Sequence, residues 1–266
     1  MTLNLSLAQM GTAAVLILIT MALSTWQRLG LTKSLLIGAL RATAQLTLMG
    51  YVLVTVFEST NPWLVGLLVV VMSVIAARTA ASRQKEAPQE RSRIFWYATF
   101  SILLSTGFTL VFVTQCVLYV EPWYSAQYVI PMGGMIISNS MNAAALGAER
   151  FASELKARRP EVETLLAMGA SPKIACWRIV RRAIAASMMP TISGLMVVGL
   201  VSIPGMMSGQ ILSGVSPLLA IRYQLVVQFM IACAAAITSM SIVMLYGRSF
   251  FDHKSESLHV HRLIGR

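Results

Sequence analysis

Apolar runs of about 20 residues recur along the chain, and this repetition constrains the fold more than any other feature. A helix of that length crosses the hydrocarbon core of a bilayer, which is about 30 Å thick. With 56% hydrophobic and 12% charged residues, the composition excludes an ordinary soluble protein. We therefore predict an all-α, multi-pass membrane protein whose residues 1–266 form a single transmembrane domain.

The apolar runs predict about seven transmembrane helices. They cover residues 7–26, 35–57, 62–77, 94–118, 129–147, 186–203 and 220–246. No Lys or Arg precedes the first run, so it lacks the basic region of a cleaved signal peptide. We expect this first run to remain as a span.

Lys and Arg residues gather in a few loops. The richest are residues 78–93, 149–182 and the tail 247–266, and seven spans place all three on one side of the membrane. The loops on the other side carry Glu58 and Glu121 but no Lys or Arg. Since basic loops remain in the cytoplasm, we expect the N-terminus outside and the C-terminus inside a plasma (inner) membrane. The same clustering accounts for the net charge of +11 without a nucleic-acid partner.

The segment 149–185 carries signals for a short cytoplasmic helix. Pro160 suits the first turn, because proline lacks only an amide proton that would be unpaired there. Gly169 can adopt the left-handed conformation that ends a helix. Leu165 and Leu166 fall on one apolar face at helical spacing. Such a helix could dock into a groove on a soluble partner or lie on the lipid surface, and the spacing fits both.

Two polar residues, Arg41 and Gln45, lie one turn apart in the second predicted span. An arginine at the centre of a bilayer costs about 2.5–3.5 kcal/mol on insertion scales, so it normally faces protein or water. Arg41 lies about two turns from the cytoplasmic end, and its long side chain could also reach the membrane surface. Both placements stay open.

Two stretches are unusual for helices that face lipid. Residues 130–142 combine a proline, paired glycines and two asparagines, and residues 202–214 combine a proline with several glycines. Backbone groups freed by proline and glycine are tolerated at membrane depth only against protein or water. The first stretch is therefore expected to line the interior of the bundle, although close helix packing could also explain the small residues of the second.

The charged segment resembles the cytoplasmic coupling loop of ABC-transporter permeases. That loop usually reads E-A-A-x-x-x-G followed by I-x-L-P; this chain has Glu163-Thr164-Leu165 before Gly169, then Ile179, with Arg181-Arg182 replacing L-P. A wider pattern is similar to the FetB-type family of bacterial metal (iron) export permeases, which has plant relatives linked to aluminium tolerance. It includes Ile130-Pro131, Gly134-Met135-Ile136, Asn139-Ser140-Met141, Gly169-Ala170-Ser171-Pro172, Val198 to Gly209 and Tyr223-Gln224.

The resemblance implies a transport subunit that is not itself an enzyme. It implies two permease copies joined to two copies of a separate cytoplasmic ABC ATPase, which binds ATP and magnesium and drives export. No G-x-x-x-x-G-K-[S/T] motif occurs in this chain, in agreement with a separate ATPase. The implied coupling residues are Glu161, Glu163, Leu165, Leu166, Gly169, Ala170, Ser171 and Pro172, and the candidate bending points are Pro190, Pro204 and Gly205.

The implied cargo is iron or another metal, yet the predicted spans offer few ligands for it. Bare iron prefers carboxylate, imidazole or water ligands, but no span contains Asp or Glu, and all three histidines lie in the tail. We therefore hypothesise that the cargo is an anionic chelate or follows a weak, hydrated path, with its ligands unidentified. The candidate path residues are Arg41, Gln45, Met135, Asn139, Asn142, Met206, Met207 and Gln210.

Three other functions compete with an ABC exporter. A secondary transporter would need an intramembrane carboxylate or histidine, and an intramembrane serine hydrolase would need a nearby base; the predicted spans lack both. A non-transporting ABC subunit that passes ATPase motion to an outside partner would need large outer loops, and the outer loops here are short. The sequence therefore favours the exporter subunit.

Overall fold

The computed structural model describes residues 7–58, 61–84 and 90–251. Over these residues the chain forms helices and no strand, which confirms the predicted all-α class, and Val198 and Ser202 form an isolated bridge. The helices are α1 (Leu7–Trp26), α2 (Thr32–Glu58), α3 (Pro62–Ser82), α4 (Arg91–Phe112), α5 (Ala126–Ala157), α6 (Arg159–Ala167), α7 (Pro172–Val197), α8 (Gly205–Leu212) and α9 (Pro217–Arg248). A π-helical turn, Val113–Val117, extends α4.

Five helices in the described residues are long and apolar enough to cross a membrane. They are α2, α3, α4 with its π-helical extension, α5 and α9. α1 is apolar over the shorter stretch Gly11–Trp26, and the first half of α7 carries four basic residues. The structure thus supports a multi-pass membrane protein, while the count of seven spans and their orientation stay predictions. The histidines of the tail lie outside the described residues.

The sixth predicted span differs most from its helix. The sequence predicts residues 186–203, whereas α7 begins at Pro172 and ends at Val197. It begins early because the proline starts a helix directly after the extended residue Ser171, and the helix then continues through its basic residues. It ends early because Gly199 has a φ of 86° and its amide donates to the carbonyl of Ser202 (2.9 Å).

Contacts divide the chain into two compact units. Unit 1 comprises Met1–Thr60 and Leu212–Gly214, and unit 2 comprises Asn61–Ile211 and Val215–Arg266. Within unit 1, α1 and α2 pack against each other as a hairpin. The Ser24 hydroxyl accepts a hydrogen bond from the Leu31 amide (3.2 Å) and stabilises the turn between the two helices.

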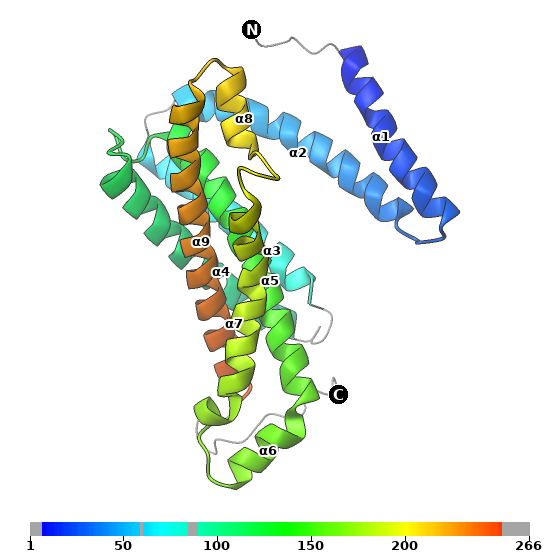
Figure 1. Ribbon diagram of the computed structural model, residues 1–266, viewed down its shortest axis with the longest axis vertical. Coiled ribbons are helices and arrows are strands. Elements are labelled where there is room, and N and C mark those ends of the chain that lie inside the picture. The colour runs from blue at the N-terminus through cyan, green and yellow to red at the C-terminus, as the bar shows by residue number, and fades with distance from the viewer. Residues whose placement is uncertain (1–6, 59–60, 85–89, 252–266) are drawn as a thin grey trace. The chain divides into compact units, whose positions relative to one another are not determined.

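Unit 2 is a bundle built around α5 (Figure 1). α5 packs against α3, α4, α7 and α9, and it is the most buried of the five candidate spans. Small residues let membrane helices approach closely, which strengthens their packing. Alanines accordingly fill the centre of the bundle, among them Ala77, Ala80, Ala98, Ala144 and Ala148.

One side of α5 faces this interior. Ile136 and Ser140 are buried there, as predicted for the span that contains residues 130–142. On the other side of the same helix Ser138 and Asn142 are exposed. The prediction that this span lines the interior is therefore confirmed for one of its two sides.

Hydroxyl groups join three helices in the interior. Thr238 on α9 donates a hydrogen bond to Ser105 on α4 (2.7 Å), and the Ser105 oxygen lies 3.3 Å from that of Ser140 on α5. All three residues are fully buried. Burying a hydroxyl is less costly when it has a partner within the protein, so this hydroxyl chain favours the observed contact between α4, α5 and α9.

Candidate functional site

A polar face of α5 is the first candidate site. Met135, Asn139 and Asn142 are spaced by four and three residues, so they lie on one side of the helix. Met135 and Asn139 are half-buried, and Asn142 is exposed. An asparagine side chain facing hydrocarbon carries a free-energy cost. This polar face is therefore suited to meet water or another protein surface.

Hydrogen bonds hold both asparagines in place. Asn139 donates through Nδ2 to the carbonyl of Met135 (2.9 Å), and Asn142 accepts through Oδ1 from Nη1 of Arg83 (2.8 Å). Arg83 is the residue that caps the C-terminal end of α3. Its guanidinium brings a positive charge to one end of the polar face, where it repels a bare cation and attracts an anion.

The other predicted path residues lie on other helices. They are Arg41 and Gln45 on α2, in unit 1, and Met206, Met207 and Gln210 on α8. In the part of the chain that the structure describes, no group of three or more His, Cys, Asp or Glu side chains is arranged to hold a metal ion. The polar face of α5 therefore presents amide and thioether groups with a cation at one end.

The short helix α6 and the turn after it form the second candidate site. α6 spans Arg159–Ala167 at one end of unit 2, with Pro160 in its first turn as predicted. Gly169 has a φ of 85° and ends the helix, as its position in the sequence predicts. Ser171 then takes an extended backbone conformation and Pro172 begins α7. We call residues 168–174 the α6–α7 corner.

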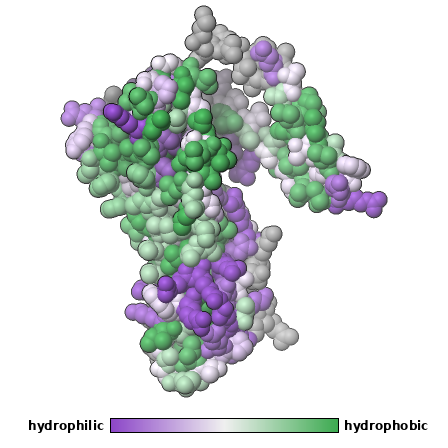
Figure 2. Space-filling view, viewed as in Figure 1, coloured by the Kyte–Doolittle hydropathy of each residue, from purple (hydrophilic) through white to green (hydrophobic). Residues whose placement is uncertain are grey.

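The apolar face of α6 turns into unit 2 rather than toward solvent. Val162 is 1% exposed and belongs to the hydrophobic core, and Leu165 and Leu166 pack against that core. The face that the sequence suggests for docking is thus partly covered by the chain itself. At the corner, the outward apolar side chains are Met168, 79% exposed, and Ile174, 67% exposed. Figure 2 shows hydrophobic surface at this tip, beyond a hydrophilic patch.

Ion pairs fix α6 in its place. Arg159 contacts Glu163 (2.7 Å), and Arg158 contacts both Glu154 at the end of α5 and Glu161 on α6 (3.1 Å each). The hydrogen bonds to Glu154 and Glu161 raise the pKa of the Arg158 guanidinium. The two predicted coupling carboxylates, Glu161 and Glu163, therefore take part in pairs within the chain. Their spacing of three and four residues from the arginines is the sequence signal for these pairs.

Comparison with known proteins identifies the family of this chain. The family model described as "Uncharacterised protein family (UPF0014)" matches residues 7–251. The chain belongs to the UPF0014 family. Both candidate sites lie inside the matched residues, and no solved structure is significantly similar to this UPF0014 protein.

Several curated relatives cover almost the whole UPF0014 chain. "UPF0014 membrane protein slr1647" of Synechocystis is 38% identical over 96% of this chain and 97% of that protein. "Protein ALUMINUM SENSITIVE 3" of Arabidopsis thaliana is 33% identical over 94% and 88%. "Probable iron export permease protein FetB" of Escherichia coli is 30% identical over 95% of each chain. These matches confirm the resemblance to the FetB-type permeases.

The remaining predicted residues of the UPF0014 protein are the bending points. Pro190 lies within α7, Pro204 directly precedes α8, and Gly205 is its first residue. Sequence reasoning missed Arg83 and Met168. Arg83 meets a residue 59 positions away, which no local pattern indicates, whereas the exposure of Met168 follows from its place just after the end of α6.

Proposed function

We propose that this UPF0014 protein is the permease subunit of an ATP-driven exporter in a plasma (inner) membrane. A separate cytoplasmic ABC ATPase supplies the energy, and the cargo is iron or another metal in chelated form. The proposal is supported by the relative that covers 95% of the chain and is named a probable iron export permease. The structural observation that carries it is the exposed α6–α7 corner at the end of a rigid bundle.

The corner suits a contact that transmits force. α6 lies across one end of unit 2, and α7 continues from the corner as one 26-residue helix (Figure 1). Buried Val162 and the contact between Arg178 and Glu161 (3.6 Å) tie α6 to the rest of unit 2. Movement of the corner would therefore move α7. Exposed Met168 and Ile174 offer an apolar contact to a groove on the ATPase.

The polar face of α5 supports a path between two copies of the chain. Asn139 and Asn142 are poorly suited to lipid, and a second copy related by twofold symmetry would bring the same face to the opposite side. A space between the two faces would be lined by amides and would admit water. The two-plus-two assembly of permeases and ATPases is part of this proposal.

The charge at the polar face favours a chelated cargo. Arg83 contributes a cation, and the structure holds no acidic cluster for bare iron among its described residues. A chelator would supply the carboxylate or other oxygen ligands that iron prefers, and its remaining negative charge would be attracted to the guanidinium. In this scheme the permease recognises the charge of the complex rather than the metal.

Reconstitution tests the coupling role. We would co-purify the chain with its ATPase, place the complex in proteoliposomes, and measure ATP-dependent movement of iron as an anionic chelate and as free Fe²⁺. Met168→Glu combined with Ile174→Glu should lower ATPase stimulation and transport together, roughly tenfold, because two charges would be forced into an apolar contact. The matched control is Lys33→Gln with Arg78→Gln, which changes net charge by the same amount at two exposed residues outside the corner.

The outcomes separate the competing functions. Unchanged ATPase stimulation in the Met168→Glu/Ile174→Glu complex would refute the docking role of the corner. Stimulation without flux of either iron form in the wild type would favour the non-transporting ABC subunit. Flux that depends on an ion gradient and not on ATP would favour a secondary transporter.

A further inference from the structure

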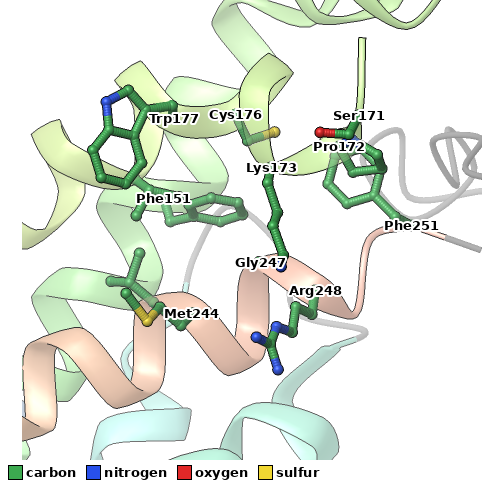
Figure 3. Close-up of a pocket in the computed structure, with 12 residues that line it drawn as sticks. Phe151, Ser171, Pro172, Lys173, Cys176, Trp177, Met244, Gly247, Arg248 and Phe251 are labelled. Carbon is green, nitrogen blue, oxygen red and sulfur yellow. The ribbon is translucent and has the colours of Figure 1, made fainter. Parts of the chain in front are cut away.

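A cavity of about 780 Å³ lies at the α6 end of unit 2, beside the α6–α7 corner (Figure 3). It lies where α5, α7 and α9 meet, apart from the polar face of α5. Its lining is largely apolar and includes Phe151, Cys176, Trp177, Val180, Val243 and Met244. An apolar surface of this kind favours a ligand with a hydrocarbon portion.

Two cations, Lys173 and Arg248, stand at the edge of this cavity. Lys173 extends from the first turn of α7 toward Gly247 on α9, and Arg248 lies next to that glycine (Figure 3). Neither side chain has a hydrogen bond or ion pair with any residue the structure describes, and no lining residue is acidic. Two neighbouring charges of the same sign repel each other. An anion between them would be stabilised by both.

Arg248 lies in the last turn of α9, where the helix dipole stabilises a cation, but no carbonyl there depends on its side chain for a hydrogen bond. The last three carbonyls of α9 each accept a hydrogen bond from a following backbone amide at 3.1–3.3 Å, so they already have partners. Lys173 lies at the N-terminal end of α7, which is the positive end of the helix dipole and an unfavourable place for a cation. A bound anion would offset this cost and the repulsion from Arg248.

We propose that the cavity binds one anionic phospholipid, with the phosphate between Lys173 and Arg248 and an acyl chain over the apolar lining. The cavity lies at the end of α9, whose 32 residues exceed the roughly 20 that cross the hydrocarbon core, so in this proposal the cavity lies outside the hydrocarbon, among the headgroups. Basic pockets between membrane helices bind anionic headgroups on the cytoplasmic side. Inorganic phosphate alone would leave the apolar lining uncovered.

The lipid would also reach the α6–α7 corner. Ser171 and Pro172 line the same cavity and begin α7. A lipid in the cavity would therefore brace the corner and strengthen its coupling to the bundle. This regulatory effect rests on the proposed coupling role, whereas the binding itself does not.

Fluorescence quenching tests the binding without any transport measurement. The full-length chain in neutral detergent is titrated with brominated phosphatidylglycerol or brominated phosphatidylcholine, and quenching of Trp177 is taken as the difference between the wild type and Trp177→Phe. We expect tighter binding of phosphatidylglycerol, weakened roughly tenfold in Lys173→Gln/Arg248→Gln because each basic side chain contributes to attraction of an anionic lipid. The control Lys33→Gln/Arg78→Gln removes two exposed cations that do not line the cavity, and it should bind as the wild type does.

Each alternative result overturns the proposal. Equal quenching by the two lipids, or unchanged phosphatidylglycerol binding in Lys173→Gln/Arg248→Gln, would show that the cations do not hold the headgroup. Displacement by glycerol phosphate at the same concentration would assign the cavity to a soluble phosphate. Binding that requires deletion of residues 252–266 would assign it to the chain's own C-terminal segment. If the double variant does not fold, Val180→Phe, which fills the cavity and keeps both charges, must weaken binding.

Discussion

The inward and outward sides of α5 use polar and small residues in different ways. Inward, Gly147 allows α9 to approach so closely that an added Cβ would lie 3.1 Å from Val243, and Ser140 joins the buried hydroxyl chain. Outward, Asn139 and Asn142 carry larger amide groups on a surface that the bundle leaves open. Short hydroxyls whose partners lie in neighbouring helices serve packing, whereas amides on an open face are available to a cargo or to a second copy.

The largest effect is expected from a substitution that disrupts packing on the inward side of α5. Gly147→Leu would place a branched side chain against Val243 and Ser187, and overpacking of this kind costs about 1–3 kcal/mol. Thermal unfolding in detergent should show a clear loss of stability. The matched control is Gly107→Leu on α4, where an added Cβ meets nothing within 4 Å. Equal losses in the two variants would show that helix propensity or lipid contact, rather than the α5–α9 approach, sets the cost.

The next largest effect concerns the outward side of α5 and tests the sign of the cargo's charge. Asn142→Asp would neutralise Arg83, which the asparagine now contacts at 2.8 Å. Export of an anionic chelate should fall roughly tenfold, because one charge near the path is cancelled. Asn142→Gln keeps an amide and should retain most of the transport. Export of the chelate that is equal or faster in Asn142→Asp would contradict attraction of an anion at this face.

The sequence predicts the helices of this protein better than the directions in which their faces point. Apolar runs indicate α2, α3, α4, α5 and α9 because a bilayer demands about 20 apolar residues whatever the tertiary contacts. The residues that begin and end α6 are local signals, and they are confirmed. An amphipathic pattern, however, identifies an apolar face without its partner. Leu165 and Leu166, where the sequence suggests a docking surface, accordingly pack in part against the core, and their role in docking stays a prediction.

The features that the sequence does not predict depend on contacts between segments that lie far apart in the sequence. Nothing near Arg83 in the sequence indicates Asn142, because their meeting depends on how α3 packs against α5. The same holds for Lys173 and Arg248, which lie on different helices at the edge of one cavity. Basic residues in loops indicate the side of a membrane, but their pairing follows only from the assembled bundle.

The smallest expected effect concerns the hydroxyl chain on the inward side. Thr238→Val keeps the shape of the side chain but removes the hydrogen bond to Ser105 (2.7 Å). Hydrogen bonds between membrane helices contribute about 0.6 kcal/mol on average and up to about 1.7, so the free energy of unfolding should fall by an amount in that range. Thr114→Val is the matched control, because that hydroxyl bonds only to carbonyls of its own helical segment. If the control loses as much stability as Thr238→Val, the hydroxyl chain contributes nothing beyond ordinary burial, and the close approach at Gly147 alone would set how α5 meets α9.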